Sequence, residues 1–470
     1  MDKNKEFIKN TFILFIGKFS TQIVSFLLLP LFTFKFSTSD YGYIDLVQTY
    51  ISLFAPVLLL QLDSAIFRYL IEARDEKSEK IKLVSTSAIF IMIILIGIIL
   101  IGTFLNVFVK IKYFSLIIVN ICVLIINMYI MSIARGNGNN KNYSISSCIS
   151  SIINLLLNLL LILIFRFDVR AILISSIISN TISTVYLIIK EDVIHEIKVK
   201  KFNIAVLKNL LKYSIPMIPN VLSWWIIGLS DRTIIVKMLS IGANGLYSVS
   251  CKFSNLLNSI FSIFNMSWQE TASIHIDDKD ADKFFSNIIN EIFILFIILC
   301  CLIVGILPLV YNLIIGKEYM DAYIYIPILI VGNLFNVLVG LFGGIYVAKK
   351  MTNKVAITTI YSALINIIFN ILFIKKFKLY AACLSTVMAY LIMSIYRYYD
   401  IRKYIKIKLE FKAITKYFLE FFILLIPYYY NKSILSLLVL LLICLMYIRR
   451  NSNIINLILD KVRKKIMEVK

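Results

Sequence analysis

Long apolar segments alternate with short polar loops along the whole chain. Each segment has about 17–25 residues or somewhat more, which is the length that an α-helix needs to cross a bilayer core about 30 Å thick. The pattern therefore predicts an all-α polytopic membrane protein with about fourteen transmembrane helices. The expected spans are 10–36, 43–70, 83–108, 114–134, 143–165, 169–190, 209–239, 244–268, 284–315, 323–348, 355–375, 379–399, 414–430 and 432–449.

The first two spans resemble the seventh and eighth. In residues 34–43 and again in 236–247, a Lys ends one span, a short polar link follows, and a Gly lies beside or near a Tyr where the next span starts. A second similarity comes later in the chain, where Asn154 and Asn158 of span 5 match Asn366 and Asn370 of span 11. Paired repeats are common in transporters, with the substrate site between the halves.

The repeats predict two lobes of six spans, and the four asparagines are expected to form hydrogen bonds between helices rather than contacts to a sugar. Two C-terminal spans and a basic tail would follow. In that tail, apolar positions within 454–462 predict a basic amphipathic helix lying on the membrane. The expected divisions are an N-lobe at 1–205, a C-lobe at 206–405, and spans 13–14 with the tail at 406–470.

Composition agrees with a membrane protein, because 60% of the residues are hydrophobic and a soluble domain would be nearer half. The formal net charge of +22 raises the question of nucleic acid. The bases lie in alternate short loops, however, as the positive-inside rule requires, and no soluble basic domain is predicted. We therefore expect no nucleic-acid partner, a multi-pass protein of the bacterial plasma (inner) membrane, and both termini in the cytoplasm.

Two lysines lie deep within predicted spans. Lys18 is about eight residues into span 1, or roughly 12 Å deep, and Lys252 is about as deep in span 8. Gln22 follows Lys18 at helical spacing, and Asn255 and Ser259 follow Lys252. Buried bases in a membrane either face a polar cavity or pair with an acid. In the first case they would bind an anionic substrate.

Acidic residues within the spans are candidates for ion coupling. Asp63 in span 2 is expected either to pair with Arg68 or to bind a coupling cation. Asp231 and Arg232 in span 7 are adjacent, so their side chains point in different directions and do not simply neutralise one another. A salt bridge to another span is the structural alternative. Glu291 in span 9 is a further proton or cation candidate.

The sequence gives little support to an enzyme. His195 and His275 lie in loops without a second ligand at metal spacing, so no metal site and no cofactor are predicted. The chain has no GxxxxGK[ST] motif that would bind ATP. No predicted outer loop is long enough for a catalytic domain, which disfavours a membrane glycan polymerase or ligase. A structural scaffold is disfavoured because it would not need buried charges in both halves.

Several phrases in order resemble the Wzx-type polysaccharide flippases, the polysaccharide-transporter branch of the MOP (MATE-like) superfamily. They are FIKNTFILFIGKFSTQIVSFLLLPLF, DYGYIDLVQTY, LDSAIFRYL, YSIPMIPN, LSDRTIIV and NGLYSVSCKF. The resemblance covers nearly the whole chain. It implies two six-helix lobes that form a V around a central cavity open alternately to either side. It also implies export of an undecaprenyl-diphosphate-linked oligosaccharide for a surface polysaccharide such as O-antigen or capsule.

The resemblance extends to site residues only in part. Relatives place bases on cavity-facing positions of spans 1 and 8, which match Lys18 and Lys252, and an acid-base pair in span 7, which matches Asp231 and Arg232. Lysine attracts a phosphate but lacks the bidentate geometry of arginine. The predicted substrate site comprises Lys18, Lys252, Arg232, Gln22, Asn255 and Ser259.

The expected partners are the bilayer, the lipid-linked cargo, a coupling proton or sodium ion, and the polymerase of the same pathway. The alternative within transport is a MATE-type cation or drug antiporter, which would need an acidic cavity.

Overall fold

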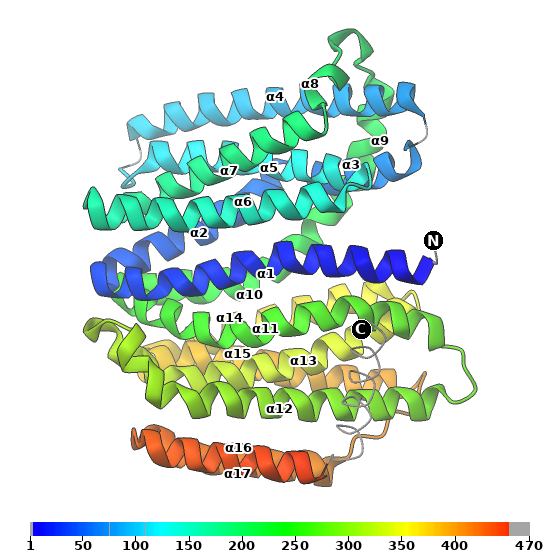
Figure 1. Ribbon diagram of the computed structural model, residues 1–470. Helices are drawn as coiled ribbons and strands as arrows, with labels where there is room; N and C mark the ends of the chain where they lie inside the picture. The colour runs from blue at the N-terminus through cyan, green and yellow to red at the C-terminus, as the bar shows by residue number, and fades with distance from the viewer. Residues whose placement is uncertain (1–2, 75, 109, 451–470) are drawn as a thin grey trace, which may run out of the picture. The chain divides into compact units, whose positions relative to one another are not determined.

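The computed structural model describes residues 3–74, 76–108 and 110–450, apart from the side chains at 3–16, 18, 220, 223–227, 266 and 352. The predicted tail helix within 454–462 lies outside the described residues. The described chain is built of helices (Figure 1). They are α1 Lys3–Lys35, α2 Thr38–Leu58, α3 Leu62–Glu72, α4 Lys77–Phe108, α5 Phe114–Gly136, α6 Asn140–Leu159, α7 Arg170–Lys190, α8 Val193–Glu196, α9 Ile204–Ser214, α10 Ile218–Met238, α11 Ile241–His275, α12 Ala281–Ile314, α13 Ile326–Ala348, α14 Thr352–Phe377, α15 Leu379–Ile401, α16 Phe411–Tyr429 and α17 Ser433–Arg450.

The helices confirm the polytopic membrane fold. Among the described residues, nine helices are long and apolar enough to cross a membrane, and α2 with α3 makes a tenth, bent span. Every one of the predicted spans overlaps a helix or a helix pair. Large apolar side chains such as Leu100, Phe108 and Ile434 are 64%, 69% and 77% exposed. Such surfaces suit contact with lipid tails, whereas exposing them to water would be unfavourable.

Two of the predicted spans are interrupted. The span at 43–70 bends by 49° between α2 and α3, where Leu60 and Gln61 have φ angles of 55° and 54°. The span at 209–239 consists of α9, a 3-10 turn at Ile215–Met217, and α10. Pro216 and Pro219 lie at this second break. Because proline lacks a backbone N–H, it removes helical hydrogen bonds and favours such breaks.

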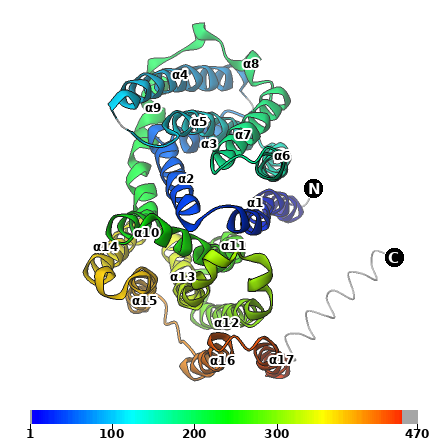
Figure 2. The ribbon, with the colours of Figure 1, turned by 90° about the vertical axis from the view of Figure 1, so that its left-hand side faces the viewer.

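The chain divides into two compact units. The first comprises Met1–Lys252, Gly316–Tyr319 and Ala356–Ala389, and the second comprises Phe253–Ile315, Met320–Val355 and Tyr390–Lys470. In the first unit, α4, α5, α7 and α6 pack side by side in that order, as Figure 2 shows along the helix axes. In the second unit, α12 contacts α13, α16 and α17. The lobe boundaries at 205/206 and 405/406 stay predictions.

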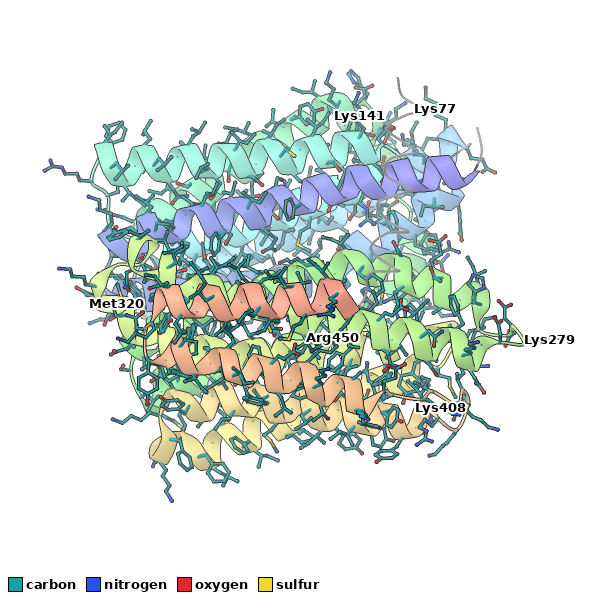
Figure 3. The ribbon with its side chains drawn as sticks, turned by 60° about the horizontal axis from the view of Figure 1, so that its bottom comes forward. Lys77, Lys141, Lys279, Met320, Lys408 and Arg450 are labelled. Carbon is teal, nitrogen blue, oxygen red and sulfur yellow. The ribbon has the colours of Figure 1, made fainter. Side chains whose placement is uncertain are left out.

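In each unit, the loops that are predicted on the same side of the membrane lie at the same end of the helices. In Figure 3, Lys77 at the start of α4 and Lys141 at the start of α6 lie at the same end of the first unit. Lys279, between α11 and α12, and Lys408, between α15 and α16, lie together at one end of the second unit, opposite Met320. These are the loops that the sequence assigns to the cytoplasmic side.

The two similar turns pack against each other in the first unit. A Cβ on Gly42 would overlap the carbonyl oxygen of Ile241, and a Cβ on Gly245 would overlap the carbonyl oxygen of Thr38. Each of these glycines is four residues beyond the first residue of its helix, Thr38 in α2 and Ile241 in α11. Asn244 also donates a hydrogen bond to the carbonyl oxygen of Gly42 at 2.7 Å. This reciprocal contact supports an internal duplication.

Replacing Gly245 by alanine is expected to destabilise the first unit. The added methyl group meets backbone rather than a movable side chain, and overpacking of this kind costs about 1–3 kcal/mol. Gly97→Ala is the matched control, because a Cβ there meets nothing within 4 Å and removing a helical glycine stabilises by about 0.5–1 kcal/mol. Thermal unfolding in detergent compares the two. Equal stability of both variants would contradict the close contact.

A buried carboxylate holds the loop between α5 and α6. The Glu191 side chain accepts hydrogen bonds from the amides of Asn137, Asn139 and Asn142 at 2.8–3.0 Å. Arg74 donates to the carbonyl oxygens of the adjoining residues Arg135 and Gly136. The polar loop of the sequence is therefore fixed from both sides.

Glu191→Gln is expected to destabilise this loop by about 1–3 kcal/mol, because amide donors would then face an amide instead of two acceptor oxygens. Glu76→Gln, at an exposed position, should have almost no effect. Thermal unfolding followed by amide hydrogen exchange at 135–142 provides the measurement. Unchanged protection in the Glu191 variant would show that the carboxylate does not hold the loop.

Candidate functional site

Five helices of the first unit line a polar cavity of about 220 Å³. They are α1, α2, α6, α7 and α11. The polar side chains come largely from serine, asparagine and glutamine, and Lys252 is the one charged residue among the described residues of the lining. The cavity polar residues are Thr21, Ser25, Tyr41, Gln48, Ser150, Ser151, Asn154, Ser179, Asn180 and Lys252. Such a lining offers hydroxyl and amide groups around a single positive charge.

Lys252 meets the expectation of a base that faces a cavity. Its Nζ donates to Ser25 Oγ at 3.1 Å, and no described carboxylate forms a salt bridge with it. Pairing with a buried acid is the alternative role, and the buried Asp45 carboxylate interacts electrostatically with Lys252, but its salt bridge is with Arg232. An ammonium group without a salt-bridge partner in a membrane bundle is costly. A bound anion would offset that cost.

The other predicted substrate residues lie in different surroundings. Lys18 belongs to α1, but its side chain lies outside the described residues. Gln22 is exposed on α1, whereas Ser25, one turn further along, lines the cavity. Asn255 is exposed, and Ser259 donates to its carbonyl oxygen at 3.0 Å. Both belong to the part of α11 in the second unit, so their substrate role stays a prediction.

Arg232 has an acidic partner that the sequence analysis missed. Its Nε donates to Asp45 Oδ2 at 2.7 Å, and the two side chains are 16% and 10% exposed. A second nitrogen of the guanidinium donates to the carbonyl oxygen of Gly228. The structural alternative, a salt bridge to another span, therefore describes Arg232 well. Asp45 is the third residue of the predicted span at 43–70, so the signal was an acid at the start of an apolar span, which is weaker than one at its centre.

Asp231 points away from Arg232, as expected of neighbouring residues on a helix. It is 2% exposed. One carboxylate oxygen accepts from Tyr247 at 2.8 Å and from Thr386 at 3.0 Å. The other accepts from Asn370 at 2.8 Å and from Ser385 at 3.5 Å.

These four donors are all neutral, and no described lysine or arginine forms a salt bridge with Asp231. Helices α10, α11, α14 and α15 of the first unit thus converge on one buried carboxylate whose charge lacks a counter-ion. Burying such a charge is expensive unless a proton or a cation joins it. The Asn370 Oδ1 atom is also buried without a hydrogen-bond partner, so an oxygen is available beside the carboxylate.

The asparagine pairs form hydrogen bonds within the first unit, mostly between helices, as expected. Asn366 donates to Ser385 and accepts from Ser230, so it connects α14 with α15 and α10. Asn154 donates to Ser179 of α7 at 3.4 Å. Asn158 instead donates within α6, to Asn154. Asn154 also lines the polar cavity, so a contact with cargo is compatible with its position.

Asp63 and Glu291, the remaining acidic candidates, differ from Asp231. Asp63 lies in the first turn of α3, just after the bend, and its Oδ1 is buried without a hydrogen-bond partner. It does not pair with Arg68, which forms a salt bridge with Glu72 at 2.9 Å. Glu291 is exposed on α12 of the second unit. Their coupling roles stay predictions.

Comparison with known proteins gives a family and a fold. The model of a family described as "Polysaccharide biosynthesis protein" matches residues 7–269. No curated protein matches the chain by sequence. A solved structure titled "Lipid II flippase MurJ, inward closed conformation" is similar, with a TM-score of 0.71 and 19% identity over 93% of this chain and 99% of that chain.

Structures of MATE transporters are also similar. An inward-facing multidrug resistance MATE family transporter of the MOP superfamily has a TM-score of 0.68 and 16% identity over 83% of this chain and 98% of that chain. An outward-facing structure of a transporter with the same description has a TM-score of 0.60 and 15% identity over 84% of this chain and 94% of that chain. At these identities the likeness shows the fold alone, which the chain shares with these flippase and transporter structures.

Proposed function

Because this chain belongs to the polysaccharide biosynthesis protein family, we propose that it is a flippase that moves a polyprenyl-diphosphate-linked oligosaccharide across the bacterial inner membrane by alternating access. The observation that carries the proposal is the Lys252 ammonium, without a salt bridge, in a polar cavity that is otherwise neutral among the described residues. A diphosphate needs positive charge, and a sugar needs hydroxyl and amide partners. The likeness to the fold of a lipid II flippase adds support.

In this proposal the diphosphate binds at Lys252, with Ser25 beside it. Gln48, Asn154 and Asn180 of the lining offer hydrogen bonds to sugar hydroxyls. Lys18, Gln22, Asn255 and Ser259 are proposed as further substrate contacts. At about 220 Å³ the cavity is below the range of about 300–1,000 Å³ that is usual for ligand sites. The first unit must therefore open to admit a whole headgroup.

Arg232 is proposed to contact the cargo only after its salt bridge with Asp45 opens. Its guanidinium charge is already compensated by Asp45, and the guanidinium lies over the ring of Tyr247 at 5.9 Å. An incoming diphosphate would compete with that carboxylate for Arg232. The Asp45–Arg232 pair thus offers a second phosphate contact that forms only when the pair opens.

Coupling is proposed to run through Asp231. Its carboxylate is the most buried of the three acidic candidates and faces neutral donors only among the described residues. Uptake of a proton or a sodium ion would cancel its charge and weaken its attraction for the surrounding donors. Tyr247, which donates to Asp231, and Lys252 share helix α11, so a change at the ion site reaches the cavity along one helix.

An antiporter of the MATE type is the second candidate, since structures of such transporters share the fold. A cation substrate calls for an acidic cavity, whereas the charged group in this lining is a lysine. A glycan polymerase or ligase lacks any such support from the fold.

The experiment that tests the proposed function is deletion of the gene followed by mass spectrometry of lipid-linked oligosaccharides. A flippase predicts that a complete repeat unit accumulates on its polyprenyl diphosphate, on the cytoplasmic side, while surface glycan is lost. Accumulation on the outer leaflet would indicate a polymerase or ligase instead. Unchanged lipids together with new sensitivity to cationic drugs would favour the antiporter.

A further inference from the structure

The second unit contains an apolar cavity of about 370 Å³ between α12, α13, α15 and α16. Its walls are mostly aromatic, with Phe293, Phe335, Phe342, Tyr398, Phe411 and Phe418 among them. Tyr399 and Phe411 in the same lining are 63% and 61% exposed, so the cavity opens at the surface of the unit. A cavity of this size and lining is suited to a hydrocarbon chain.

The linker between α15 and α16 contributes Leu409 to the wall of this cavity. The backbone N–H groups of Lys406, Lys408 and Glu410 each donate to a side chain of α12 at 2.9 Å. The acceptors are Asp282, Ser286 and Asn290, spaced one helical turn apart. Every second residue of the linker is fixed in this way. Leu409 then faces the cavity, and Lys406 and Lys408 remain exposed.

The linker and its flanks are strongly basic. Between 402 and 412 there are five bases and one acid, Glu410. Lys403 pairs with Asp400 at 3.2 Å. Arg402 lies over the ring of Tyr398 at 5.4 Å, and Tyr398 lines the cavity. Among the described residues, no carboxylate forms a salt bridge with Arg402, Lys408 or Lys412. Bases without a salt-bridge partner therefore lie beside residues that line an apolar cavity.

We propose that this cavity binds one acyl chain of an anionic phospholipid, whose phosphate contacts Arg402, Lys408 and Lys412. In a phospholipid the charged phosphate lies next to the start of the acyl chains. Here the bases likewise lie next to residues of the apolar wall, Tyr398, Leu409 and Phe411. Bases between transmembrane helices on the cytoplasmic side are a known form of anionic-lipid recognition. A polyprenyl carrier would leave most of its long chain outside a cavity of this volume. The site is independent of the proposed transport function.

The test uses the purified full-length protein in a non-ionic detergent, titrated with phosphatidylglycerol or phosphatidylcholine, with bound lipid counted by native mass spectrometry. The Arg402→Gln/Lys408→Gln/Lys412→Gln variant is expected to lose about a hundredfold in phosphatidylglycerol affinity, at roughly fivefold per base. The matched control is Lys198→Gln/Lys200→Gln/Lys201→Gln, which removes three exposed lysines of the first unit and should retain the lipid.

A second variant examines the cavity with every base in place. Ser394 lines the cavity and is 3% exposed, so Ser394→Phe should fill part of the space and reduce phosphatidylglycerol binding at least tenfold. Ser394→Ala should bind as the wild type does. Equal retention of phosphatidylcholine, or unchanged binding in both the triple variant and Ser394→Phe, would overturn the proposal. The proposal would also be overturned if the protein bound undecaprenyl phosphate through Arg402, Lys408 and Lys412 but did not bind phosphatidylglycerol.

Discussion

Lys252→Ala is expected to reduce export at least tenfold while the folded protein remains in the membrane. Among the described residues that line the polar cavity, Lys252 carries the positive charge. Its ammonium group donates a hydrogen bond to the hydroxyl of Ser25. Hydrogen bonds to charged groups contribute about 1.5–3 kcal/mol, which corresponds to roughly ten- to a hundredfold in affinity or rate. Loss of this cation should raise the barrier for a diphosphate and leave the packing intact.

Export in the Lys252 variants would be measured as surface glycan and as lipid-linked oligosaccharide retained in the cytoplasmic leaflet. Lys252→Arg keeps the charge and should keep partial activity. Lys237→Ala removes an exposed lysine from the end of α10 and should export normally. Wild-type export by Lys252→Ala at equal protein abundance would show that the cavity charge does not bind the cargo.

Asp231→Asn is expected to remove the dependence of transport on an ion gradient. The substitution keeps the shape of the side chain but cancels the buried charge. Its amide oxygen can still accept from Asn370, and its NH2 group can donate to the hydroxyls of Tyr247 and Thr386, which are able to accept. Without that charge, the side chains around residue 231 no longer attract a proton or a cation. Transport should then proceed at one rate, whether or not a gradient is imposed.

Proteoliposomes with an imposed proton gradient, and separately a sodium gradient, provide the measurement for Asp231. The wild type should respond to one of the two, and Asp231→Asn to neither. Glu76→Gln is the control, because Glu76 is exposed and lies outside the candidate coupling residues, so the response should be unchanged. A gradient response that survives in Asp231→Asn would place coupling elsewhere, with Asp63 as the next residue to replace.

The spans and the internal similarity follow from the sequence for a simple reason. Apolar segments of bilayer length and short basic loops are local features, and each has one physical interpretation in a membrane. Pro56, four residues before Leu60, is the sequence signal for a break between α2 and α3. The positive φ angles of Leu60 and Gln61 could not be predicted, because neither residue is a glycine. The glycine pair was found as a repeat, but its contact across α2 and α11 needed the structure.

The site was predicted only in part, because its partners are distant in sequence. Lys252 and Asp231 stood out as charges within apolar segments. The shell of Asp231 joins Tyr247 with Asn370 and Thr386 from α14 and α15, and nothing in the sequence indicates which hydroxyls meet which acid. Asp45, the third residue of its predicted span, carried a weaker signal than Asp231, so the partner of Arg232 was missed.

The most direct test of the central claim is a flipping assay with purified protein in proteoliposomes. The cargo is the lipid-linked oligosaccharide extracted from the deletion strain, and its appearance on the opposite leaflet is followed by its access to an added glycosidase. We expect movement that requires the protein and that falls at least tenfold with Lys252→Ala. No movement above protein-free vesicles, or equal movement with Lys252→Ala, would contradict it.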